Sequence, residues 1–139
     1  MKQRMSVSEI MSKNVITANT TDSLRRVSSM LKENNIRHIP ILEGNKLVGI
    51  VSKTDIMRLS FGDMFEGQGD SDEALFDLLT LAQVMVSDPV TINADELIKD
   101  VAEKFTKIEF HALPVLKDDK VVGIVSTTDL IKYLLDQYN

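Results

Sequence analysis

The chain has 139 residues, 43% of them hydrophobic and 27% charged, which is typical of one globular domain or two very small ones. The absence of cysteine excludes disulfides and a catalytic thiol, and two histidines are too few for a histidine-rich metal site. The net charge is −5, and residues 59–98 contain nine acidic and no basic side chains, which disfavours nucleic acid and anionic membranes as partners. No apolar run approaches the ~18 residues of a membrane span. Because the chain has no cysteine, we expect a cytoplasmic protein.

The chain contains an internal repeat with a constant offset of 74 residues. Sliding the sequence by this offset aligns Met11–Ser60 with Met85–Leu134 without a gap, and fourteen of the fifty positions are identical. The identity is densest between Lys46 and Asp55 in the first copy. Most of the other positions keep their apolar or polar character, which indicates a duplicated structural unit.

Each copy begins with a short β segment and a helix. The segments Val15–Thr17 and Val90–Ile92 read as strands. Thr21 and Asp95 offer N-caps for the helices that follow. The apolar residues of these helices recur with a helical period and predict one buried face each: Leu24, Val27 and Leu31 in the first copy, Ile98, Val101, Phe105 and Ile108 in the second.

A β-hairpin and a second helix complete each copy. Its first strand contains a proline, Pro40 or Pro114, which predicts an edge strand or a strand entry because proline cannot donate to a ladder. The turns Gly44-Asn45 and Asp118-Asp119 tolerate positive φ. The order is β-α-β-β-α, twice, so the fold class is mixed α/β (α+β). We expect the two repeats to pack about a pseudo-two-fold axis, since neither copy buries its sheet alone.

The domain boundaries follow from the repeat. We place repeat 1 at residues 6–60, an acidic loop with a connecting helix at 61–80, and repeat 2 at 81–137. The apolar residues Met57, Phe61, Met64 and Phe65 indicate core packing or a dimer contact.

The sequence Gly-Ile-Val-Ser-x-Thr-Asp occurs at 49–55 and again at 123–129, where a strand runs into a helix. Ser-x-x-Asp at a helix start is typical of a capping box, in which both side chains serve only the backbone. The same geometry also suits a ligand, because a helix start binds anions and an ionised aspartate accepts from both hydroxyls of a ribose. The glycine would allow the backbone to approach that ligand closely. Both interpretations stay open from the residues alone.

The duplicated pattern, the proline-bearing strands (Ile39-Pro40-Ile41 and Leu113-Pro114-Val115) and the two Gly-to-Asp stretches resemble a tandem pair of cystathionine β-synthase (CBS) domains, a stand-alone Bateman module. The resemblance covers about residues 6–135. It implies sensing of an adenosine ligand, most often AMP, ADP or ATP, sometimes S-adenosylmethionine or a cyclic dinucleotide.

The resemblance also implies roles for individual residues. Asp55 and Asp129 match the ribose-binding acid. Ser52 and Ser126 match the phosphate-contacting hydroxyl. The remaining matches are the neighbouring phosphate donors Thr54 and Thr128, the positions Arg37 and His111 three residues before each strand proline, and the backbone at the adenine edge, Ile16, Thr17, Val90 and Thr91.

The two expected pockets differ in their charge. Arginine is permanently charged and histidine is not, so the Arg37 side favours highly charged phosphates. His38 adds a second difference, because its counterpart in repeat 2 is Ala112.

We therefore expect a regulatory module that binds an adenosine nucleotide and acts on an unidentified partner protein, as a homodimer. We expect no enzymatic activity, no metal and no further cofactor, because the sequence lacks a Gly-x-Ser-x-Gly elbow and a phosphate-binding lysine loop. The alternatives are a dimeric interaction scaffold whose Ser-x-x-Asp elements act only as caps, or a module for S-adenosylmethionine or a cyclic dinucleotide.

Overall fold

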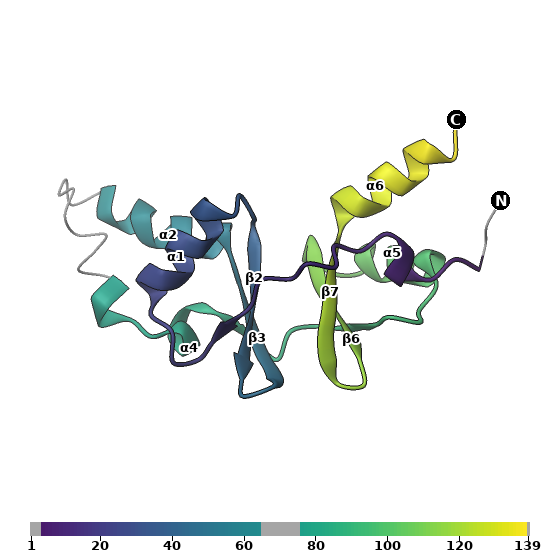
Figure 1. Ribbon diagram of the computed structural model, residues 1–139. Coiled ribbons are helices and arrows are strands. Elements are labelled where there is room, and N and C mark those ends of the chain that lie inside the picture. Colours follow the sequence, from purple (N-terminus) through teal and green to yellow (C-terminus); the bar gives the residue numbers. More distant parts are fainter. Residues whose placement is uncertain (1–3, 65–75, 139) are drawn as a thin grey trace. The chain divides into compact units, whose positions relative to one another are not determined.

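The computed structural model describes residues 4–64 and 76–138 of the chain (Figure 1). The chain folds into two compact units. One unit is the continuous segment Ile16–Pro89. The other combines Val90–Asn139 with the beginning of the chain, Met1–Val15.

The unit Ile16–Pro89 is built around one four-stranded sheet with the strand order β1-β2-β3-β4. β1 runs parallel to β2, and the other pairs are antiparallel. Figure 1 shows α1 and α2 together beside the β2–β3 hairpin. The elements in chain order are β1 (Ala18–Asn19), α1 (Leu24–Glu33), β2 (His38–Glu43), β3 (Lys46–Ser52), α2 (Lys53–Met64), α4 (Leu81–Val84) and β4 (Val86–Ser87).

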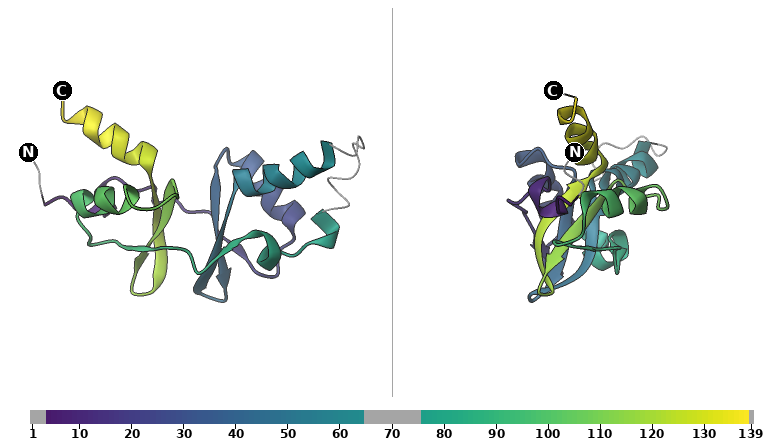
Figure 2. Two further views of the ribbon diagram at one scale, coloured as in Figure 1. Left: turned by 180° about the vertical axis from the view of Figure 1, so that it is seen from behind. Right: turned by 90° about the vertical axis from the view of Figure 1, so that its right-hand side faces the viewer.

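The second unit repeats this arrangement with a three-stranded sheet, order β5-β6-β7. Its hairpin, like that of the first unit, is seen from behind and from the side in Figure 2. The elements are η1 (Val7–Glu9), β5 (Ile92–Asn93), α5 (Ile98–Phe105), β6 (Ala112–Lys117), β7 (Lys120–Ser126) and α6 (Thr127–Asp136). The predicted order β-α-β-β-α, twice, is confirmed.

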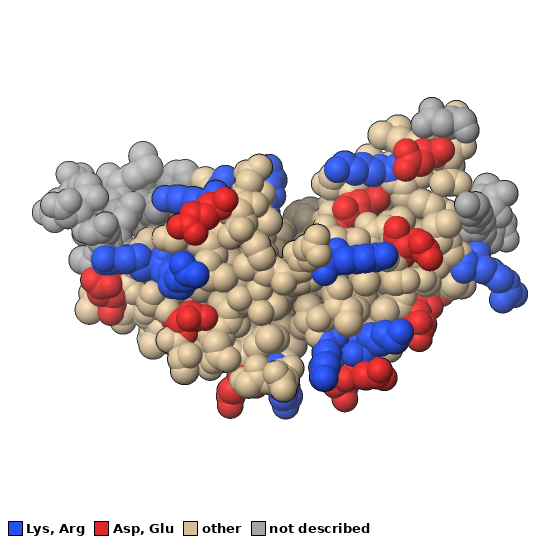
Figure 3. Space-filling view, in the orientation of Figure 1, with Lys and Arg blue, Asp and Glu red and all other residues tan. Residues whose placement is uncertain are grey.

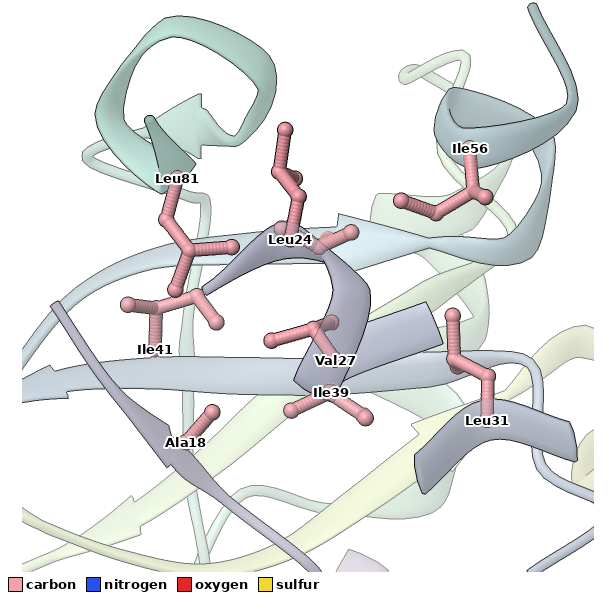
Figure 4. Close-up of a cluster of buried hydrophobic side chains, with 9 residues drawn as sticks. Ala18, Leu24, Val27, Leu31, Ile39, Ile41, Ile56 and Leu81 are labelled. Atoms are coloured by element: carbon pink, nitrogen blue, oxygen red, sulfur yellow. The ribbon is translucent and has the colours of Figure 1, made fainter. Parts of the chain in front are cut away.

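Each unit has its own hydrophobic core, and the predicted helix faces supply it. Leu24, Val27 and Leu31 of α1 are buried in one cluster with the β2 side chains Ile39 and Ile41 (Figure 4). In the second unit Val101 is fully buried against β6, with Phe105 and Ile108 packed at its margin. Burying one such side chain stabilises the fold by about 1.5–3 kcal/mol.

The first segment of each sequence repeat packs in the unit formed by the other repeat. Val7 is fully buried in the core that contains Val101 and Val125, and Leu81, its counterpart 74 residues later, is buried against α1 and β2. Backbone hydrogen bonds fix the exchange: Ser12 N–H donates to Ile124 O (2.9 Å), and Ile124 N–H donates back to Ser12 O (3.0 Å). The sequence repeats and the compact units are therefore made of different segments.

Two local predictions are wrong, the starts of the first strands and the starts of the helices that follow them. The first strands begin at Ala18 and Ile92, later than predicted. The helices begin after Ser23 and Leu97, two residues beyond the predicted caps Thr21 and Asp95. An intervening turn delays both helices. In it the Asp22 carboxylate accepts from Asn19 N–H (2.7 Å), and the Glu96 carboxylate accepts from Asn93 N–H (2.7 Å).

Of the two predicted positions for the prolines, the edge strand is wrong, because β2 and β6 are central, and the strand entry fits, because pairing with β1 and β5 begins only after each proline. β2 lies between β1 and β3, and β6 lies between β5 and β7. β1 pairs with β2 only from Ala18↔Ile41 onward, because Pro40 has no N–H to extend the ladder further. The hairpin turns do use positive φ, at Gly44 (62°), Asp118 (52°) and Asp119 (63°), as their residues predict.

The predicted connector is described only in part. Residues 65–75, with Phe65 and most of the acidic loop, lie outside the described residues, as do the side chains of Phe61 and Met64. Beyond them Arg25 Nη2 forms an ion pair with Asp77 (3.0 Å), which attaches residue 77 to α1 at the surface.

Candidate functional site: two strand-to-helix junctions

The Ser-x-x-Asp elements form capping boxes at the starts of α2 and α6. In repeat 1 Asp55 N–H donates to Ser52 Oγ (3.0 Å), and Ser52 N–H donates to Asp55 Oδ2 (2.9 Å). In repeat 2 Asp129 N–H donates to Ser126 Oγ (3.1 Å), and Ser126 N–H donates to Asp129 Oδ2 (2.8 Å). The structural interpretation of the motif is confirmed at both positions.

The residues three positions before each proline reach the same junctions through their backbone. Lys53 N–H, the first in α2, donates to Arg37 O (2.8 Å). Thr127 N–H, the first in α6, donates to His111 O (2.9 Å). Arg37 and His111 are both exposed. Sequence reasoning chose these residues for their side chains and missed the backbone contact that holds them beside the helix starts.

Each junction retains polar groups that its capping box does not use. Of the first N–H groups of the two helices, those of Thr54 and Thr128 have no acceptor within the described parts of the chain. The carboxylates bond the serine N–H through Oδ2, which leaves Oδ1 of Asp55 and Asp129 directed elsewhere. A donor at a helix start beside a carboxylate oxygen can bind a ligand that carries both an anion and a hydroxyl.

The strand prolines leave a further backbone group unpaired. Thr20 N–H donates to Leu42 O (2.9 Å), and bonds of a parallel pair recur at every second residue. The next hydrogen bond of the β1–β2 pair, on the side nearer to Ser52, would run from the N–H of residue 40 to Ile16 O. Residue 40 is a proline and has no N–H, so this bond cannot form. In the described residues no hydrogen bond reaches Ile16 or Thr17.

Repeat 2 has the same arrangement. Ala94 N–H donates to Leu116 O (2.8 Å), and Pro114 removes the rung to Val90 O. Extending the register from Ile92↔Val115 places Val90 and Thr91 beside the end of β6 where Ala112 pairs with Ser126. Residues 16–17 take the corresponding position beside His38↔Ser52. The structure thus brings each predicted backbone segment toward its junction within one unit.

The glycines of the motif face methionines, which corrects their predicted role in approaching a ligand. A Cβ on Gly49 would lie 2.9 Å from Met85 Cγ, and a Cβ on Gly123 would lie 2.8 Å from Met11 Cγ. Both methionines come from the exchanged segments. The sequence contains one indication of these contacts, because Met11 and Met85 are identical residues at equivalent positions of the repeat.

The two carboxylates differ in their surroundings. Asp55 Oδ1 lies 3.6 Å from Nη1 of Arg58, whose side chain is 76% exposed. The residue at the corresponding place in α6 is Lys132, and no ion pair joins it to Asp129 in the part of the chain that the structure describes. Nor do the described residues contain a group of three acidic or histidine side chains suited to a metal ion.

Comparison with known proteins places this geometry in a family. The family described as "CBS domain" matches the chain twice, over residues 7–62 and 81–136. The two matches have the same 74-residue offset as the repeat and cover most of the sequence.

Solved structures share the fold over the whole chain. The CBS domain pair of protein MJ0100, crystallised with 5′-methylthioadenosine and S-adenosyl-L-methionine, has 31% sequence identity and a TM-score of 0.77, covering 97% of this chain and 98% of that one. CBSX2 in complex with AMP has a TM-score of 0.77 over 96% of this chain and 98% of that one, at 18% identity, which supports the fold alone.

Curated relatives are longer proteins. The L-aspartate semialdehyde sulfurtransferase of Methanocaldococcus jannaschii is 32% identical over 126 residues, which are 89% of this chain and 22% of that protein. An uncharacterised protein of the same organism is 30% identical over 135 residues, 94% of this chain and 32% of its own length. This chain spans between 22% and 46% of the curated relatives compared. None of its described helices combines the length and apolar character needed to cross a membrane.

Proposed function

Because the chain belongs to the CBS domain family, we propose that it is a regulatory module that binds adenosine nucleotides, AMP, ADP or ATP, at its two strand-to-helix junctions. The observation that carries the proposal is the set of polar groups at each junction that neither the capping box nor the backbone pairing uses. A carboxylate oxygen, a helix-start N–H and an unpaired backbone carbonyl are the partners that a ribose, a phosphate and an adenine amino group require.

Each group takes one part of the ligand. Oδ1 of Asp55 or Asp129 accepts from the ribose hydroxyls. The phosphate is bound by the N–H of Thr54 or Thr128 and the hydroxyl of Ser52 or Ser126, with Arg37 or His111 beside it. The adenine edge meets the backbone of residues 16–17 or 90–91.

The known neighbours support this ligand class. The MJ0100 domain pair holds two adenosine derivatives and shares 31% of its sequence with this chain. The module then acts by transmitting its occupancy to a partner protein, in the cytoplasm, without a catalytic step or a metal of its own.

The test replaces the acid by its amide. Asp129→Asn and Asp55→Asn keep one oxygen to accept from the serine N–H, so the cap survives, but an amide NH₂ takes the place of the free oxygen. We expect AMP affinity at the altered site to fall roughly ten- to a hundredfold, since a hydrogen bond to a charged group contributes about 1.5–3 kcal/mol.

Isothermal titration calorimetry measures the affinity, and circular dichroism checks that the variants remain folded. Equal AMP binding by the wild type and the double Asp→Asn variant would show that the aspartates do not bind the ribose.

A second candidate function, a dimeric scaffold, is favoured by the surface of α6. No residue of α6 is buried, and Ile131, Leu134 and Leu135 are each more than half exposed. Met57 on α2 and Leu78 are exposed as well. Such apolar faces typically mark contacts with another chain.

A thermal-shift panel separates the candidates. Stabilisation by AMP, ADP, ATP, S-adenosylmethionine or a cyclic dinucleotide identifies the ligand class. If none of them stabilises the protein while sedimentation shows a dimer, the scaffold is the better description.

A further inference from the structure

The two junctions share their backbone but differ at the positions that surround it. Three positions carry permanent cations in repeat 1 and change in repeat 2. Arg37 corresponds to His111, Lys53 to Thr127 and Arg58 to Lys132. The junction of Asp55 therefore carries three permanently charged residues, whereas the junction of Asp129 carries one lysine and a histidine.

The hydrogen bonds keep these cationic residues at the junction. Arg37 O accepts from Lys53 N–H (2.8 Å), so the two residues lie side by side at the start of α2. Arg58 lies one turn into the same helix, with Nη1 3.6 Å from Asp55 Oδ1. The side chains of Arg37, Lys53 and Arg58 are exposed and able to reorient toward a ligand.

The charge difference is local. On the face shown in Figure 3, basic and acidic side chains alternate over the surface and form no extended field of one sign. Exposed charges are screened over about 8 Å at physiological salt, so only cations beside the junction act on a bound ligand.

We propose that the two junctions, which both accept adenosine nucleotides, differ in their preference: repeat 1 prefers a nucleotide with one or more phosphates, and repeat 2 binds an adenosine derivative without phosphate at least as tightly as a nucleotide. This inference rests on the proposed function and specifies its ligands. At repeat 1 the ribose hydroxyls displace the Arg58 guanidinium from Asp55 Oδ1. The released guanidinium joins Arg37 and Lys53 in neutralising the phosphates, where charge-assisted hydrogen bonds are strongest.

Repeat 2 favours a less charged ligand for the same reason. The N–H of Thr128 and the hydroxyl of Ser126 can bind a neutral polar group. With Lys132 as the one permanent cation of the three positions, a polyphosphate would lose its hydration with little compensation. A nucleoside or a 5′-thioether fits this balance of charge.

Single-site variants make the two sites measurable separately. Asp129→Asn leaves the repeat 1 site intact, and Asp55→Asn leaves the repeat 2 site. Each is titrated calorimetrically with adenosine, 5′-methylthioadenosine, AMP and ATP. At repeat 1 we expect AMP to bind on the order of tenfold more tightly than adenosine, with a preference that shrinks as salt is raised. At repeat 2 we expect 5′-methylthioadenosine to bind at least as tightly as AMP.

A charge exchange tests the cause. The triple variant Arg37→His, Lys53→Thr, Arg58→Lys is expected to abolish the phosphate preference of repeat 1. The reciprocal variant His111→Arg, Thr127→Lys, Lys132→Arg is expected to create it in repeat 2. Lys46→Thr is the matched control, because Lys46 is an exposed cation at the opposite end of β3 and its loss should change nothing.

The outcomes separate this inference from the proposed function. The same ligand order at both sites, or a preference that does not follow the exchanged residues, overturns the inference and leaves adenosine binding intact. If no adenosine compound binds either single-site variant or the wild type, the proposed function itself is wrong.

Discussion

The junctions of repeat 1 and repeat 2 have the same backbone and different neighbours. Serine, aspartate, proline and glycine are identical in the two copies, and each serves the fold: two build the cap, one ends the pairing with the first strand, and one makes room for a methionine. The residues that differ lie around this frame. The comparison teaches that duplication preserved the residues that build the junction and varied the charged residues around it.

The units also differ in how their first helices begin. Ser23 Oγ accepts from Arg26 N–H (3.0 Å) at the start of α1. α5 begins after Leu97, which has no capping side chain, and there Ile98 N–H donates to Met5 O (3.0 Å). The exchanged N-terminal segment thus replaces a side-chain cap, and the second unit depends on a distant part of the chain where the first depends on a neighbour.

The largest expected contrast concerns the two glycines. A Cβ at Gly123 would lie 2.9 Å from the backbone oxygen of Ser12, whereas at Gly49 the close atoms all belong to the flexible Met85 side chain. We expect Gly123→Ala to lower the free energy of unfolding by about 2–3 kcal/mol and Gly49→Ala by about 1 kcal/mol, within the usual cost of overpacking. Urea unfolding measures both.

The methionines provide the control for that prediction. Met85→Ala in the Gly49→Ala background should recover part of the lost stability, because it removes the only close side chain. Met11→Ala should rescue Gly123→Ala less, since the Ser12 oxygen remains. If the two glycine substitutions lowered the free energy of unfolding equally, the Ser12 oxygen would contribute nothing to the difference and the prediction would be wrong.

A smaller contrast is expected at the caps. Ser126→Ala and Ser52→Ala each remove an acceptor worth about 1 kcal/mol at a helix start. α2 is also held by the buried Ile56, whereas α6 buries no residue. Amide hydrogen exchange should therefore show faster opening of α6 in Ser126→Ala than of α2 in Ser52→Ala. Thr54→Ala and Thr128→Ala are matched controls, since neither residue serves its cap through its side chain.

The smallest effect is expected at Arg58. Its ion pair with Asp55 is exposed on the arginine side, and such pairs contribute about 0.2–1 kcal/mol. Arg58→Ala should lower stability by less than about 0.5 kcal/mol, and 0.5 M salt should remove the difference from the wild type. A loss above 1 kcal/mol, measured by urea unfolding, would mean that Arg58 holds the junction together and is not free for a ligand.

Features encoded by neighbouring residues were predictable from the sequence. The apolar faces of α1 and α5, the turns at Gly44 and Asp118-Asp119, and both capping boxes depend on contacts within a few residues. The candidate site was predictable because its serine, aspartate and proline all recur at the same 74-residue offset. A capping box that arises by chance would not recur together with a proline at a fixed distance.

Features set by distant contacts were not predictable. The late start of β1 depends on the missing N–H of Pro40, a residue of another strand. The place of Val7 in the core of the second unit depends on segments from the opposite end of the chain. The glycines and the methionines each recur as identical pairs in the sequence repeat. The 74-residue offset shows that the members of a pair are equivalent, but it does not show which methionine contacts which glycine.

The exchange of first segments has a consequence for the order in which the protein can be made. Ser12 leaves the ribosome early but pairs with Ile124, with almost the whole chain in between. The unit Ile16–Pro89 can close while the rest is still being synthesised. In the other unit Met5 and Val7 wait for their partners Ile98 and Glu96, and Ser12 waits until β7 emerges. Long-range closure of this kind is slow and leaves apolar residues such as Val7 uncovered in the meantime. If the chain were cut between the sequence repeats, each half would contain the first segment that packs in the other half's unit. Both repeats must therefore be made together for either unit to be complete.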